Sequence, residues 1–172
     1  MKTVRTLPFP KAKEKVGGSV TSFRATRRNL PNWQQPGSIY FITWLLQEEK
    51  ILSPEERTIV LKSILYWDKV KWTVHAAVVM PNHVHVITQP LFLSDGGAVN
   101  LSGIIRSVKT FSARTIHARR GIRGTSWQDE RYDRFIRDEA ELLQKWQYLR
   151  HNPVERGLVA KPEDYPWLYE KG

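Results

Sequence analysis

Two histidines and a tyrosine–asparagine pair are the residues whose types and spacing could support chemistry in this sequence. His83 and His85 lie two apart in a segment, residues 81–87, that is rich in β-branched side chains. On a β-strand both imidazoles would project from one face, about 7 Å apart, and could share one metal ion. The spacing alone leaves a second interpretation open, in which they are ordinary strand histidines.

The second pair, Tyr148 and Asn152, lies four residues apart near the end of the last predicted helix. This spacing places the phenol and the carboxamide on one helix face, one turn from each other. A tyrosine at helical spacing is also typical of a core or surface position. Asn152 directly before Pro153 is equally typical of a helix end.

The elements that must position these pairs alternate along the chain. Strands are predicted near residues 38–44, 72–80, 83–88 and 131–136 from their branched and aromatic side chains, with a turn at Pro81 and Asn82 between the second and third.

Helix signals separate these strands. Ser53 is a predicted N-cap followed by Pro54, and residues 101–118 carry apolar positions at helical spacing before Gly121. Asp138 caps the final helix, which Pro153 and Gly157 end. The order β-α-β-β-α-β-α predicts an α+β fold, a ferredoxin-like antiparallel sheet with helices on one face.

Composition limits the partners. The 172 residues carry a formal charge of +10 and a pI near 10.0, which favours a polyanion such as nucleic acid. No apolar run approaches the roughly 20 residues that span a bilayer, so no membrane partner is expected and a cytoplasmic, nucleoid-associated location is predicted. The absence of cysteine excludes disulfides and thiolate ligands.

Basic residues gather in two segments. Residues 1–30 carry eight Lys and Arg against one acid, 8 − 1 = +7, and are interpreted as a basic arm before a domain at 31–160 and a C-terminal tail at 161–172. Residues 96–128 contain no acid. A solvated tail and a solvated helix face are the alternatives. The candidate DNA-binding residues here are Arg24, Arg27, Arg28, Arg106, Lys109, Arg114, Arg119, Arg120 and Arg123.

The segments Met-Pro-Asn-His-Val-His at 80–85 and Tyr-Leu-Arg-His-Asn-Pro-Val at 148–154 together resemble the REP-associated tyrosine transposases, a branch of the single-tyrosine HUH transposases. The resemblance runs from about residue 28 to 160. Further matches in content and order are Pro31-Asn32-Trp33, 40–43, 109–111, 127–128, 132–133, 136–137 and 157–159.

This resemblance implies that His83 and His85 bind Mg²⁺ or Mn²⁺, with Asn152 as the third ligand. It also implies that Tyr148 attacks single-stranded DNA beside a REP-like palindromic hairpin and forms a 5′-phosphotyrosine intermediate. Arg150 is the expected basic neighbour of the phenol and a further DNA-binding candidate. Trp33, Trp127 and Tyr132 are candidates for base stacking, with core packing as the alternative.

The sequence departs from relatives that often carry histidine where Arg134 and Arg150 stand, which puts any proton transfer by those histidines in doubt. His151 could stand in for the second only from another helix direction.

Two other functions compete. A non-catalytic DNA or RNA hairpin-binding protein would need only the charge, and a two-histidine phosphodiesterase would need a second His motif that this sequence lacks. A monomer is favoured over a homodimer.

Overall fold

The computed structural model describes residues 34–48 and 50–172, and within them five strands form one antiparallel sheet in the order β4-β1-β3-β2-β5. The first four strands have the predicted ferredoxin-like arrangement, so the fold class is confirmed. The strands are β1 Tyr40–Leu46, β2 Trp72–Val79, β3 His83–Pro90, β4 Trp127–Phe135 and β5 Leu168–Glu170. The helices are α1 Pro54–Leu65, α2 Leu101–Arg120 and α3 Glu139–Glu155, with a short 3₁₀ helix, η1, at Pro162–Asp164.

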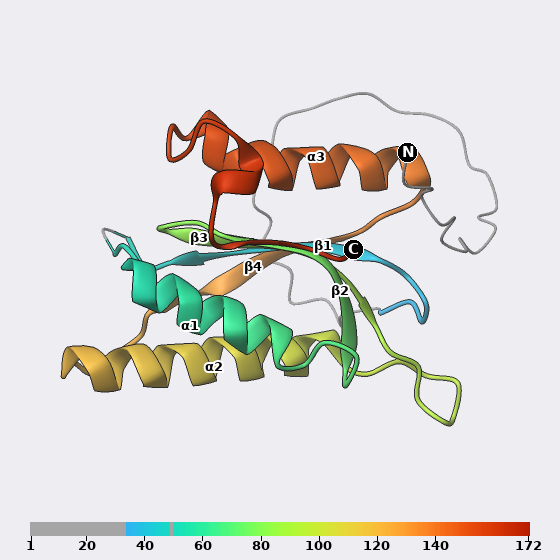
Figure 1. Cartoon of the computed structure of the whole chain (residues 1–172). Coiled ribbons are helices and arrows are strands. Elements are labelled where there is room, and N and C mark those ends of the chain that lie inside the picture. Colours follow the sequence, from blue (N-terminus) through green and yellow to red (C-terminus); the bar gives the residue numbers. More distant parts are fainter. Residues whose placement is uncertain (1–33, 49) are drawn as a thin grey trace.

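The helices lie on both faces of the sheet, which corrects one expected detail. Figure 1 shows α1 and α2 side by side on one face and α3 alone on the other. The central strands explain this arrangement, because β2 and β3 are buried at nearly every position and therefore need cover on both sides. The face under α1 and α2 is called the core face below, and the other is called the α3 face.

The core face is formed by alternate residues of each strand. Ile42 and Trp44 of β1 and Val84 and Val86 of β3 are fully buried there against apolar residues of α1 and α2. Burial at about 25 cal/mol per Å² of apolar surface makes this layer the main stabilising element of the fold.

Local signals set the helix starts where the sequence predicted them, whereas α3 continues through Pro153 to Glu155, so Pro153 does not end the last helix as predicted. Ser53 and Glu56 form a capping box at the start of α1. The Asp138 side chain accepts a hydrogen bond from the Glu141 amide at the start of α3, and Gly121 ends α2 at a φ of 63°. These caps fix where α3 begins, and hence which of its side chains face the sheet.

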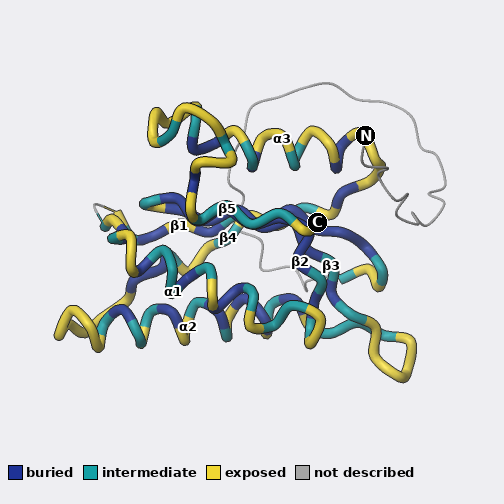
Figure 2. The backbone as a smooth tube through the Cα atoms, viewed as in Figure 1, coloured by how far each residue is buried: buried dark blue, intermediate teal, exposed yellow. Residues whose placement is uncertain are grey.

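The segment 161–172, expected as a tail, contributes to the sheet. Its strand β5 pairs with β2, which places it at the edge opposite β4. Glu170 of β5 accepts hydrogen bonds from Trp146 Nε1 at 2.6 Å and from Arg150 at 2.5 Å, both on α3. Figure 2 shows the sheet buried between the two helix layers and the outer side of α3 exposed. The segment therefore ties α3 to the sheet.

No helix in the described part of the chain is both long and apolar enough to cross a membrane.

Candidate active site

His83 and His85 lie on the α3 face of β3. Opposite them in the register of β1 are Leu45 and Thr43, respectively. The two imidazole rings are 4.8 Å apart between centroids, and both residues are buried. Strand alternation thus places both rings on one face, as the spacing predicted.

Each imidazole uses its Nδ1 for a hydrogen bond within the protein. His83 Nδ1 is 2.7 Å from Asn82 Oδ1, to which it donates, and His85 Nδ1 is 2.7 Å from the Thr43 hydroxyl. In the neutral tautomer whose proton is on Nδ1, the Nε2 lone pair is available. His85 Nε2 is buried without a hydrogen-bond partner, so this ring nitrogen is not satisfied within the protein.

Burial favours the neutral form of both rings. It lowers the pKa of His85 to about 3, assisted by the neighbouring His83, Lys145 and Arg156. Burial likewise lowers the pKa of His83, assisted by Arg156, while the neighbouring Asn152 side chain acts in the opposite direction. Neutral imidazole is the form that coordinates metal ions, so these rings need lose no proton near neutral pH.

Tyr148 and Asn152 reach the histidines from α3. The Tyr148 ring lies 5.3 Å from the His85 ring and 6.1 Å from Phe41 between centroids, and the residue is 45% exposed. Asn152 is 3% exposed, and its Oδ1 has no hydrogen-bond partner. The structure therefore brings His83, His85, Tyr148 and Asn152 together. These four residues are called the His-Tyr-Asn cluster below.

A divalent metal ion fits this cluster. The described residues contain no group of three His, Cys, Asp or Glu that could hold a metal, so a third protein ligand would have to be another donor, such as an amide oxygen. The unpartnered Oδ1 of Asn152 meets that need, because rotation of its carboxamide can turn the oxygen toward His83. Two imidazoles, one amide oxygen and water suit Mg²⁺ or Mn²⁺ better than a closed zinc site.

The cations nearest the cluster differ from the expected one. Arg150 forms ion pairs with Glu170 and Glu163, so its guanidinium binds the C-terminal segment. Lys145, whose Nζ lies 5.2 Å from the Phe41 ring, and Arg156 are the cations that act on His85. Sequence reasoning missed both, although they stand one helical turn before Tyr148 and one after Asn152.

The predicted DNA-binding residues of α2 and the following turn fall into two groups, those held by bonds within the protein and those that are exposed. Arg120 is held by Glu56 and the Ile51 carbonyl, and Lys109 donates to the Gln128 carbonyl at 2.6 Å. Burial also lowers the pKa of Lys109. The remaining members, Arg106, Arg114, Arg119 and Arg123, are exposed. Arg24, Arg27 and Arg28 lie outside the described residues.

The candidates for base stacking differ in their exposure. Trp127 is buried, packs edge-on against Trp44 and donates to the Ser112 hydroxyl, so the core interpretation applies to it. Tyr132 is 39% exposed and lies opposite Thr43 in the register, on the α3 face. Trp33 lies outside the described residues.

The sheet order, the helix layers and the His-Tyr-Asn cluster define an α+β protein of the ferredoxin-like class. Its fold is shared with a solved REP-associated tyrosine transposase bound to a REP hairpin, at a TM-score of 0.67 and 22% sequence identity over 82% of this chain and 81% of the other. A putative transposase from Deinococcus radiodurans R1 gives a TM-score of 0.44 and 17% identity over 75% of this chain and 97% of the other. Neither a family model nor a curated protein matches the sequence.

Proposed function

We propose that this chain is a metal-dependent single-stranded DNA endonuclease and strand transferase of the single-tyrosine HUH type. The observation that carries the proposal is the meeting of two neutral imidazoles, an unpartnered amide oxygen and a half-exposed phenol on the α3 face. A fold in itself does not define a reaction, so the proposal depends on this cluster.

The metal would be held by His83, His85 and Asn152. When bound, it supplies a positive charge that neutralises the non-bridging oxygens of the scissile phosphate. Thr43 and Asn82 are positioning residues, because their hydrogen bonds to Nδ1 fix the tautomer and ring orientation of the histidines.

Tyr148 is the proposed nucleophile. Its phenolic oxygen attacks the phosphorus, a new oxygen–phosphorus bond forms, and the bond from phosphorus to the 3′ oxygen breaks. The phenol loses its proton and the 3′ oxygen gains one, so the products are a 5′-phosphotyrosine and a free 3′-hydroxyl. Attack by another 3′-hydroxyl reverses the step and joins strands without an external energy source.

The cations beside the cluster assist this step. Lys145 stands one helical turn before Tyr148 and Arg156 one turn after Asn152, and the charges of both act on His85. Fixed positive charge in a partly buried site stabilises the negative charge that develops in the transition state.

Hairpin DNA with a single-stranded flank is the proposed substrate. The net charge of +10 favours a polyanion, and the solved transposase of the same fold is bound to a REP hairpin. REP-like palindromes are therefore the first DNA to test.

The test is to incubate the protein with labelled hairpin DNA and Mn²⁺ or Mg²⁺ and to resolve protein-linked DNA on a denaturing gel. A covalent band is expected that requires metal and is lost in Tyr148→Phe. Tyr66→Phe is the matched control, because Tyr66 is 72% exposed at the end of α1 and stands apart from the cluster. Tight metal-independent binding without any adduct would instead establish the non-catalytic hairpin-binding alternative.

A further inference from the structure

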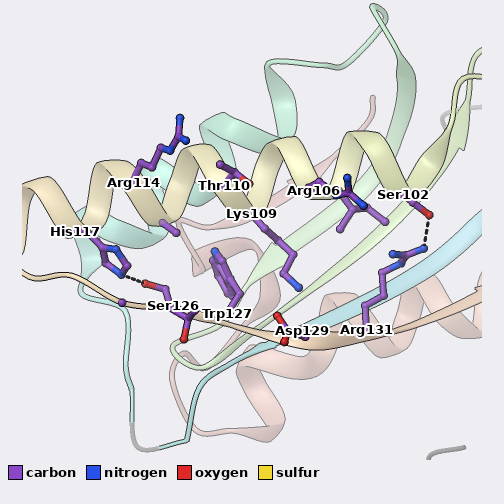
Figure 3. Close-up of a pocket in the computed structure, with 14 residues that line it drawn as sticks. Ser102, Arg106, Lys109, Thr110, Arg114, His117, Ser126, Trp127, Asp129 and Arg131 are labelled. Atoms are coloured by element: carbon purple, nitrogen blue, oxygen red, sulfur yellow. Dashed lines mark hydrogen bonds between the residues drawn. The ribbon is translucent and has the colours of Figure 1, made fainter. Parts of the chain in front are cut away.

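A second site lies between α2 and the edge strand β4. It is a groove of about 530 Å³, lined along one side by α2 and along the other by β4 and the turn before it. Figure 3 shows the Lys109 and Arg131 side chains reaching into the space between the two elements.

The groove is positively charged. Arg106, Lys109, Arg114 and Arg131 line it, whereas Asp129 is its one acidic lining residue. Arg131 is held by Ser102 and Asp133, and Lys109 by the Gln128 carbonyl. Arg106 and Arg114 are exposed and form no ion pair with the residues that the structure describes. Lys109 and Arg131 thus reach into this space, whereas Arg106 and Arg114 stand along its α2 side, where the Arg114 side chain points away from β4 (Figure 3).

The spacing of the arginines suits a phosphate backbone. Arg106 and Arg114 stand eight residues apart on α2, which corresponds to about 12 Å along the helix axis. One DNA strand carries a charge about every 3.4 Å along its duplex axis, so this distance spans three to four phosphates.

The described lining of the groove contains no exposed Phe, Tyr or Trp ring on which a base could stack. Trp127 is 5% exposed and donates its ring N–H to the Ser112 hydroxyl, and the His117 imidazole is hydrogen-bonded to Ser126. Single-stranded DNA is held largely by base stacking on aromatic rings, whereas a duplex is positioned by backbone contacts. The lining therefore favours a duplex.

Strand β4 stands between this groove and the His-Tyr-Asn cluster. Arg131 pairs with Trp44 in the register and points to the core face, toward α2. Tyr132 and Arg134 pair with Thr43 and Phe41 and point to the α3 face. Because β4 is an edge strand, a DNA chain can pass around it from one face to the other without crossing the sheet.

From these observations we propose that the groove between α2 and β4 binds the duplex stem of the hairpin through its phosphates, with Arg106 and Arg114 as the main contacts. The single-stranded flank then passes around β4, over Tyr132, to Tyr148. This inference rests on the proposed function, which names hairpin DNA as the substrate, and it adds where the stem lies.

The test is binding of the full chain, without metal, to a labelled blunt hairpin stem and to the single-stranded flank alone, over a range of salt concentrations. The variant R106Q/R114Q removes two charges from the groove. The control K62Q/K161Q removes two charges from exposed residues outside it. In the groove variant, stem affinity should fall about 10- to 100-fold, and the slope of log affinity against log salt should decrease by about 2, while flank affinity stays within about twofold.

Equal stem affinities of the groove variant and the control would overturn the inference, as would an equal loss for stem and flank. Cleavage plays no part in this measurement. Absence of a tyrosine adduct would thus count against the proposed function alone. Unchanged stem binding in R106Q/R114Q would count against the groove as the stem-binding site alone.

Discussion

The two faces of the sheet use neighbouring residues of the same strands for different purposes. On the core face, Trp44 and Val84 are fully buried in a continuous apolar layer under α1 and α2. On the α3 face, the adjacent residues Thr43 and His85 form a hydrogen bond with each other, and the second ring nitrogen of His85, Nε2, is buried without a partner. Period-two alternation lets one strand contribute to both layers.

This difference shows how the fold can carry a destabilising site. A buried polar atom without a partner costs about 1 to 3 kcal/mol. His85 Nε2 and Asn152 Oδ1 are two such atoms on the α3 face, and Trp44 Nε1 is one on the core face. The core face offsets that cost from the opposite side of the same sheet. The predictions below test this separation of stability from chemistry.

The largest expected effect is on the core face. Trp44→Ala should lower the free energy of unfolding by about 3 to 5 kcal/mol, because it leaves a cavity among fully buried side chains. Chemical denaturation measures this change. Trp44→Phe is the control, since it keeps most of the volume and should cost clearly less. Similar small losses in both variants would contradict the assignment of stability to this face.

Lowering the pH should reduce the stability of the fold through His75, a buried histidine outside the His-Tyr-Asn cluster. Burial lowers the pKa of His75 from 6.5 to about 4, with Lys171 acting in the same direction. The unfolded chain therefore binds this proton more tightly, so stability is complete above pH 6.5 and declines as the pH falls toward 4. The full loss amounts to about 3 kcal/mol.

Comparing unfolding at pH 7 and pH 4 in the wild type and in His75→Gln isolates this contribution. The variant should lose less stability on acidification. An identical pH dependence in both proteins would show that His75 does not titrate in this way.

On the α3 face, Thr43→Val should change chemistry more than stability. It removes the hydroxyl that bonds His85 Nδ1, and loss of such a partner typically lowers metal affinity about 10- to 100-fold. The rise in melting temperature on adding Mn²⁺ measures affinity independently of cleavage. Thr43→Ser keeps the hydroxyl and should keep the affinity. A weakened response in Thr43→Ser as well would argue against this hydrogen bond.

The smallest expected effect is at the start of α3. Asp138→Ala removes the N-cap that accepts from the Glu141 amide and should cost about 1 kcal/mol in unfolding free energy. Asp138→Asn retains a capping oxygen and serves as the control in thermal denaturation. Because Tyr148 lies farther along the helix, adduct formation should stay near the wild-type level. A strong loss of adduct would show that the helix start also positions the nucleophile.

Much of the fold was predictable because local signals set it. Capping at Ser53 and Asp138 and the branched residues of the first four strands gave the element order. The face taken by α3 was not predicted, although a signal existed. Residues 76–80, Ala-Ala-Val-Val-Met, are apolar without alternation, which indicates a strand covered on both faces. Strand β5 was missed because three residues carry too little local pattern, and pairing with β2 defines it.

The cluster was predictable in part. Strand alternation places both histidines on one face, but which helix covers them depends on long-range packing. Ion pairs were the other unpredictable element. Sequence reasoning could not foresee that Glu56 would hold Arg120, or that Glu170 would hold Arg150, because these partners meet only in the folded chain.

The hydrogen bonds that Glu170 accepts from Trp146 and Arg150 matter when truncated copies of related genes are interpreted. A stop codon before Leu168 would leave every residue of the His-Tyr-Asn cluster in the encoded chain. It would nevertheless remove β5 and, with it, the hydrogen bonds that Glu170 accepts from Trp146 and Arg150 of α3, the helix that carries Tyr148. A gene copy with intact histidine and tyrosine motifs can therefore encode a chain whose α3 lacks this support, and the codons for residues 168–170 have to be inspected with the motifs.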